Sequence, residues 1–200
     1  MSQFRPIARV NFIFKIISKI IEDRLAQLMP SLISKEKRGF IHGRNIKDCI
    51  LIASEATNFL DTKSFGENLA LKVDIVKEFD TLELSFFIQV LKQFGFSDTF
   101  CSWIKAILDS AHLSISINGT QHGYFKCSRG VRQGHPLSPL LFCLAEVLSR
   151  GISKLVENGE LELISGPRHC NIPSHTLYAD DIMIICKGKT SCINSLIQGF

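Results

Sequence analysis

The chain has 200 residues, of which 46% are hydrophobic and 21% charged, so it can bury a core and is not a disordered segment. Its seven cysteines include no C-x-x-C pair, which argues against a disulfide framework or a zinc site and for reduced intracellular thiols. Ser18, Lys19, Ser138 and Glu146 interrupt the apolar runs before they reach the roughly 20 residues of a membrane span, and the N-terminus has no cleavable signal pattern.

The formal net charge of +4 is unevenly distributed along the chain. Residues 1–48 contain ten of the 23 Lys and Arg residues but only four of the 19 acids, and the remainder is slightly acidic. A basic front on a near-neutral body suits a polyanionic partner such as nucleic acid. The alternative is an ordinary solvated helix face.

The N-terminal third is predicted to be mainly helical. Apolar residues recur at steps of three or four over residues 10–29, which predicts an amphipathic helix that Pro30 ends. A second helix is expected over residues 46–60. The sequence LALKVDI at residues 69–75 then has the composition of a buried strand.

The middle of the chain carries clear helix and turn signals. A helix over residues 85–94 is expected to close at Gly95, and Ser97 is a suitable N-cap for another helix that extends to Leu108. Asn118-Gly119 follows an alternating stretch and predicts a hairpin.

The C-terminal third continues the alternation of helix and strand. Ser138-Pro139 suits the start of a helix that ends near residue 156, and residues 193–197 have the pattern of another helix. Residues 176–186 (TLYADDIMIIC) predict two short strands around an acidic tip. The order of elements indicates an α+β fold whose antiparallel sheet is covered on one face by helices.

Two adjacent carboxylates, Asp180 and Asp181, lie between these apolar strands. Burying paired carboxylates is costly unless a cation neutralises them. The alternative is an exposed polar turn, in which Asp is common. Asp74 ends the earlier strand, so three carboxylates would converge if the two strands were neighbours. Such an all-oxygen site suits two Mg²⁺ or Mn²⁺ ions that promote an in-line displacement at a phosphate.

A glycine-punctuated loop, RGVRQGHPLSP at residues 129–139, precedes the predicted helix. Its glycines allow the backbone to approach a ligand closely. Arg132 suits a phosphate, and Gln133 suits a sugar or a base. The alternative is a plain loop with a helix cap.

In this order, these three segments resemble the reverse transcriptase domain of LINE-type non-LTR retrotransposons. The Asp74 strand with Phe79-Asp80 is similar to the first catalytic motif, and Tyr178-Ala179-Asp180-Asp181 to the polymerase catalytic box. Arg132-Gln133-Gly134 with residues 136–139 is similar to the motif that grips template and nucleotide. Residues 4–7, 15–19 and 39–44 are similar to the family's fingers segment.

The resemblance implies a partial right-hand polymerase with an antiparallel palm sheet backed by helices. Fingers are expected over about residues 1–68 and palm with inserted fingers elements over residues 69–200, with the thumb missing and no endonuclease or RNase H domain. The implied reaction is RNA-directed DNA synthesis, in which dNTPs are added to a DNA primer on an RNA template. Nuclear action is expected from the family alone, and the oligomeric state is not readable.

The resemblance also assigns roles to matched positions. Asp74, Asp180 and Asp181, with the backbone of Ile75, would hold two Mg²⁺ or Mn²⁺ ions. The remaining assignments cover the nucleotide and the nucleic acid: Phe79, Gln133, Arg38, Arg44 and Lys72 for the nucleotide, and Arg132, Gly134 and Tyr178 for template or primer.

Four departures from the family pattern bear on activity: Glu78 stands in place of a small Ala, His135 in place of Asp, Leu84 in place of Trp and Lys37 in place of Gln. An extra carboxylate at position 78 would repel a triphosphate or compete for metal. Two alternatives to an active domain are an inactive truncated relic that at most binds nucleic acid and a pseudogene product that folds poorly. A third alternative is a related branch such as a group II intron maturase, because the motifs do not separate the branches decisively.

Overall fold

The computed structural model describes residues 11–39, 41–61, 66–74, 82–110, 112–126, 130, 142–164, 172–178 and 181–199. The chain divides into two compact units, one formed by Met1–Asp23 and Lys77–Leu144 and the other by Arg24–Val76 and Ala145–Phe200. We call these unit 1 and unit 2. The division into fingers and palm expected from the sequence stays a prediction.

Unit 1 contains two helices whose ends the sequence predicted. Helix α4 spans Leu84–Gln93 and is followed by Gly95, which adopts a φ of +85° as the expected C-terminal glycine. Helix α5 spans Asp98–Asp109, and the Ser97 hydroxyl accepts the backbone N–H of Phe100 at 3.2 Å. Both predicted helices are confirmed, with bounds shifted by one residue or more.

A two-stranded antiparallel hairpin, β2 (His112–Ile117) and β3 (Thr120–Lys126), also belongs to unit 1. Its turn residues Asn118 and Gly119 have φ angles of +50° and +83°. Two left-handed residues are what a tight two-residue hairpin requires, so the hairpin prediction is confirmed.

Helix α1 spans Phe12–Leu32 and contains Pro30, so the prediction that the helix ends before this proline was wrong. Proline has a helical φ but no N–H, so the helix loses one hydrogen bond at Pro30; the loss is tolerated in the last turn, where only Ser31 and Leu32 follow. The guanidinium of Arg44 lies at this end of the helix and donates to the carbonyls of Pro30 and Ile33, at 3.4 and 2.9 Å. The last turn therefore has partners outside the helix.

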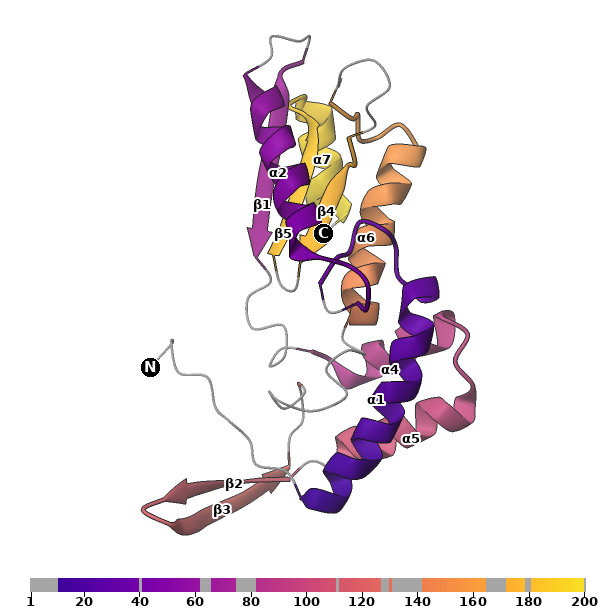
Figure 1. Cartoon of the computed structure of the whole chain (residues 1–200), viewed down its shortest axis with the longest axis vertical. Coiled ribbons are helices and arrows are strands. Elements are labelled where there is room, and N and C mark those ends of the chain that lie inside the picture. Colours follow the sequence, from indigo (N-terminus) through magenta and orange to yellow (C-terminus); the bar gives the residue numbers. More distant parts are fainter. Residues whose placement is uncertain are drawn as a thin grey trace. The chain divides into compact units, whose positions relative to one another are not determined.

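Unit 2 is built on a three-stranded sheet in the order β1-β5-β4 (Figure 1). Strands β1 (Asn68–Asp74) and β4 (His175–Tyr178) both pair antiparallel with the central strand β5 (Asp181–Lys187). The two strands predicted around the acidic tip are thus confirmed. The position of Asp74 at the end of its strand is confirmed as well.

Helices cover both faces of this sheet, whereas the sequence analysis expected one covered face. Residues Ile182, Ile184 and Cys186 of β5 belong to a core cluster with residues of α6 (Phe142–Glu157) and α7 (Thr190–Gly199). On the opposite face, Met183 and Ile185 pack with residues of α2 (Ile46–Leu60). Figure 1 shows α2 lying along the sheet. The apolar stripe of α2 requires this cover, which the sequence pattern did not assign.

Strand β1 is only half-buried, because it is an edge strand that pairs with β5 alone, so the expected burial was wrong. The predicted bounds of α2 are confirmed, and α6 and α7 occupy two further predicted helices. The predicted cap Ser138-Pro139 and the last strand residue Ile75 lie outside the described residues. None of the helices in the described ranges is long and apolar enough to cross a membrane.

We expect Ile182→Ala to lower the free energy of unfolding by about 2–5 kcal/mol, because it leaves a cavity in the core cluster packed against the central strand β5. Ile182 is 0% exposed, whereas Ile197 of α7 is 70% exposed. Ile197→Ala is therefore the matched control and should change stability by no more than about 0.5 kcal/mol. Urea unfolding followed by circular dichroism measures both. Equal effects of the two substitutions would contradict the described core.

Candidate active site

Two carboxylates from distant parts of the sequence meet at one end of the sheet in unit 2. Asp74 is the last residue of β1 and Asp181 the first residue of β5, and the strand register places them directly opposite each other. Directly opposed residues of antiparallel strands share a face, with Cβ atoms roughly 5 Å apart. Two like charges in this position repel each other, so the pair favours a nearby cation.

The side chain of a lysine, Lys72, lies beside these carboxylates. Lys72 precedes Asp74 by two residues, so both side chains lie on the same face of β1. Its Nζ lies 2.9 Å from Asp181 Oδ1, and the two side chains are 66% and 54% exposed. Asp181 is therefore open to solvent and to ions.

A hollow of about 260 Å³ adjoins this ion pair, between α2 and the sheet. Its walls are mostly apolar, and Lys72, Tyr178 and Asp181 are among the residues that line it. The remaining lining comes from Ile46, Cys49, Ile50 and Ala53 of α2 and from Thr176, Ile182 and Met183 of the strands. The site thus combines charged groups with an apolar surface next to them.

Several predicted site residues cannot be placed on this edge. Asp180, Ile75, Phe79, Arg132, Gln133 and Gly134 lie outside the described residues, as do Glu78 and His135. Within the described ranges no group of three or more His, Cys, Asp or Glu side chains could hold a metal ion. The structure therefore brings two of the three predicted carboxylates together, and the third stays a prediction.

Arg38 is joined to the strand that leads into the candidate site. Its backbone N–H donates to the carbonyl of Leu177 at 3.0 Å, and the N–H of Leu177 donates to the carbonyl of Glu36 at 3.0 Å. This bridge adds residues 36–38 to the outer edge of β4, and Lys37 is fully buried there. The Arg38 guanidinium pairs with Asp48 at 2.9 Å.

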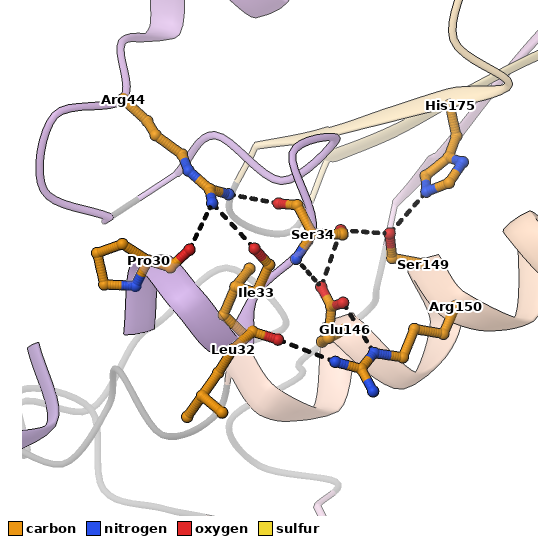
Figure 2. Close-up of polar contacts among 9 residues, drawn as sticks. All are labelled: Pro30, Leu32, Ile33, Ser34, Arg44, Glu146, Ser149, Arg150 and His175. Carbon is orange, nitrogen blue, oxygen red and sulfur yellow. Dashed lines mark hydrogen bonds and ion pairs between the residues drawn. The ribbon is translucent and has the colours of Figure 1, made fainter. Parts of the chain in front are cut away.

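Arg44 makes contacts that support a structural role. Besides Pro30 and Ile33, its guanidinium donates to the carbonyls of Ser34 and Lys37 (Figure 2 shows three of these four contacts). Burial, followed by the charge of Arg38, lowers the pKa of Arg44. These hydrogen bonds connect the end of α1 to the segment beside β4. A contact of Arg44 with nucleotide stays a prediction.

A buried polar network anchors β4 to α6 and to the end of α1 (Figure 2). Glu146 of α6 accepts the backbone N–H and the hydroxyl of Ser34 at 3.0 and 2.9 Å. The Ser34 hydroxyl lies 2.9 Å from that of Ser149, which in turn lies 2.7 Å from His175 Nε2. Arg150 donates to Glu146 at 3.0 Å and to the carbonyl of Leu32 at 2.9 Å.

His175, the first residue of β4, is the member of this network on the sheet, and it is neutral near pH 7. Burial lowers its pKa to about 4, and the charge of Glu36 opposes this shift only in part. Its Nδ1 lies 2.8 Å from the hydroxyl of Ser174, so both ring nitrogens have partners. His175 precedes Tyr178 by three residues, and the network therefore fixes the strand that enters the candidate site.

Sequence reasoning missed this network. It noted Glu146 only as a break in an apolar run, although Arg150 follows it by four residues on the same helix face. An acid in an apolar helix segment with a basic partner one turn later was the available signal. Ser34, Ser149 and His175 gave no comparable signal.

The comparison with known families decides the identity. The family model described as reverse transcriptase (RNA-dependent DNA polymerase) matches residues 1–198. The chain belongs to this family. The resemblance found in the sequence motifs is thereby confirmed, and by descent this reverse transcriptase domain is that of an RNA-directed DNA polymerase.

The relatives place this reverse transcriptase domain among non-LTR retrotransposon proteins. It is 30% identical over 146 residues, 72% of the chain, to the transposon TX1 uncharacterized 149 kDa protein of Xenopus laevis, of which it covers 11%. It is also 30% identical over 126 residues, 63% of the chain, to a Pol polyprotein from a type-1 retrotransposable element R2 of Popillia japonica, of which it covers 20%. The chain thus spans a fifth or less of these relatives.

Solved structures support the fold of the reverse transcriptase domain. An apo telomerase from Candida tropicalis, truncated from its C-terminal domain, superposes with a TM-score of 0.61 at 13% identity. The match covers 96% of this chain and 40% of the telomerase chain. Mixed helices and an antiparallel sheet are thus consistent with the expected fingers-palm fold.

We expect the stability of the domain to fall as the pH drops from about 6.5 to 4. An unfolded histidine takes up its proton near pH 6.5, whereas His175 resists protonation down to about 4, so acid favours the unfolded state. The contribution is complete above pH 6.5 and is lost toward pH 4, by about 3 kcal/mol at most. Urea unfolding at several pH values measures it.

His175→Gln should flatten this part of the pH profile, because it removes the titrating ring. His122, an exposed histidine of β3, provides the control His122→Gln, which should keep the wild-type slope. A wild-type slope in His175→Gln would show that His175 is not the buried neutral group described.

Proposed function

We propose that this domain catalyses RNA-directed DNA synthesis, adding deoxynucleotides from dNTPs to the 3′-hydroxyl of a DNA primer on an RNA template. The observation that carries this proposal is the register that places Asp74 opposite Asp181. Carboxylates of two distant motifs, which the family resemblance assigns to catalysis, occupy one end of one sheet. Family membership gives the reaction class, and this pairing supports its location at this end of the sheet.

The residues at this edge fit a divalent metal. Reverse transcriptases generally use divalent metal ions. The donors here are carboxylate oxygens on rigid strands, which suit Mg²⁺ or Mn²⁺, and the ion pair of Asp181 with Lys72 supports a cation at this position. We infer that Asp74 and Asp181, with Asp180 and the backbone of Ile75, hold two such ions. Ions held by these residues would supply activation of the primer hydroxyl and stabilisation of the leaving pyrophosphate.

The hollow beside Asp181 supports our proposal that nucleotide or primer binds next to the carboxylates. Tyr178 lines this hollow, which supports its proposed contact with template or primer. Lys72 is close enough to Asp181 to meet a triphosphate held there. The roles of Phe79, Gln133 and Arg38 toward the nucleotide, and of Arg132 and Gly134 toward template or primer, rest on the matched motifs.

The proposed nucleic-acid partners agree with the charge of the chain. The first 48 residues carry ten Lys and Arg against four acids, which favours contact with phosphates. A second telomerase structure with a TM-score of 0.58, from Candida albicans, is in complex with a fragment of telomeric RNA. An RNA template is therefore the partner we propose, and nuclear action is expected from the family alone.

We expect Asp181→Asn and Asp74→Asn to reduce primer extension by roughly a hundredfold or more, because each removes a charged metal ligand. The assay uses a primed RNA template, labelled dNTPs and Mg²⁺ or Mn²⁺. Asp109→Asn is the matched control, since Asp109 forms an ion pair with Lys105 in unit 1. It should keep wild-type extension.

Retained extension in both site variants would sink the assignment of these carboxylates. Failure of the folded wild-type protein to extend, together with salt-dependent binding of the primed template, would instead identify an inactive relic. Changing Glu78 to Ala and His135 to Asp would then test whether these departures cause the loss.

A further inference from the structure

Lys72 stands out among the side chains of β1 because its neighbours in the strand are apolar and partly buried on the other face. Leu71 and Val73 pack against the core cluster beneath the sheet. Strand alternation directs Lys72 to the opposite face, the face of Asp74 and Asp181. The chain thus places a cation on the surface that carries the two carboxylates.

The Lys72 side chain points toward the negative charge of Asp181. In the strand register Lys72 is opposite Met183, whereas Asp181 is opposite Asp74. To reach Asp181 Oδ1 at 2.9 Å, the ammonium must cross diagonally to the next residue pair on that face. Long side chains can bridge such diagonal neighbours, and the repulsion between two opposed carboxylates favours the bridge.

We propose that Lys72 is the counter-cation of the metal-free site, which pairs with Asp181 until a divalent ion displaces it. The inference rests on the proposed function, since it assumes that Asp181 is a metal ligand. Both partners are more than half exposed, so the pair is weak and screened by salt. A divalent ion that bridges carboxylates can therefore replace it.

This competition has two consequences. Lys72 lowers the affinity of the site for metal, and the difference that it makes shrinks as ionic strength rises. Once displaced, the ammonium would remain on the face that carries Asp74 and Asp181, within reach of a triphosphate bound at these carboxylates. The Lys72 side chain would then have two positions. It pairs with Asp181 in the metal-free site and makes the nucleotide contact expected from the sequence once metal is bound.

Calorimetric titration of the folded domain with Mn²⁺, without nucleic acid or nucleotide, tests the proposal. We expect Lys72→Met to bind Mn²⁺ about two- to fivefold more tightly than wild type at low salt, and the gap to close at high salt. Lys72→Arg keeps the charge and should bind like wild type. Lys189→Met is the matched control, because it removes the same charge from an ion pair with Glu162 elsewhere in unit 2.

Asp181→Asn separates the possible failures. If this variant loses Mn²⁺ affinity while Lys72→Met binds like wild type or more weakly, the role of Lys72 is overturned and the metal site stands. If Lys189→Met tightens binding as much as Lys72→Met, the effect is one of net charge and the proposal is again overturned. If Asp181→Asn binds like wild type, the metal site and the role of Lys72 fail together.

Discussion

The candidate site depends on one constraint, the antiparallel register between β1 and β5. This register places Asp74 opposite Asp181, and a slip of one residue would turn every side chain of β1 to the other face. Side chains of β1 itself resist such a slip, because Leu71 and Val73 pack against the core cluster of Ile182 and Ile184, and the slip would direct Lys72 into that core instead. Packing of apolar side chains on one face of the sheet therefore fixes the position of two charged groups on the other.

The other strand that enters the site is held by polar contacts. Residues 36–38 bridge to β4 through the backbone at Leu177, and His175 links the same strand to α6 through Ser149. Because both ring nitrogens of His175 and the carboxylate of Glu146 have partners, this buried network is satisfied and can define one arrangement. Arg44 extends the support by joining the end of α1 to this segment. The polar residues thus position the strand that carries Tyr178.

Local sequence signals predicted much of the fold, because local physics determines those elements. Ser97 caps a helix by its own hydroxyl, Gly95 ends one by its positive φ, and Asn118-Gly119 forms a turn that few other pairs allow. Each of these depends on residues within a few positions. The family motifs likewise assigned Asp74 and Asp181 to one site, and the strand register places these residues opposite each other although 107 positions separate them in the sequence.

Features that depend on tertiary packing were not predictable in the same way. From the sequence alone, the convergence of Asp74 and Asp181 was conditional on their strands being neighbours. The register between these strands depends on core residues that lie far apart in the chain. The sequence did not predict that α1 continues through Pro30, because Arg44, which donates to the carbonyl of Pro30, belongs to another segment. The half-buried state of β1 and the cover by α2 depend on strand order, which periodicity does not reveal.

The central claim is that the opposed carboxylates of β1 and β5 form a metal site. Anomalous diffraction from crystals of the domain soaked in Mn²⁺ tests it most directly. The account predicts an anomalous peak within about 2.5 Å of carboxylate oxygens of both Asp74 and Asp181, with Lys72 moved away from Asp181. Mn²⁺ bound elsewhere on the chain, with these carboxylates bare and the Lys72–Asp181 pair intact, would contradict it.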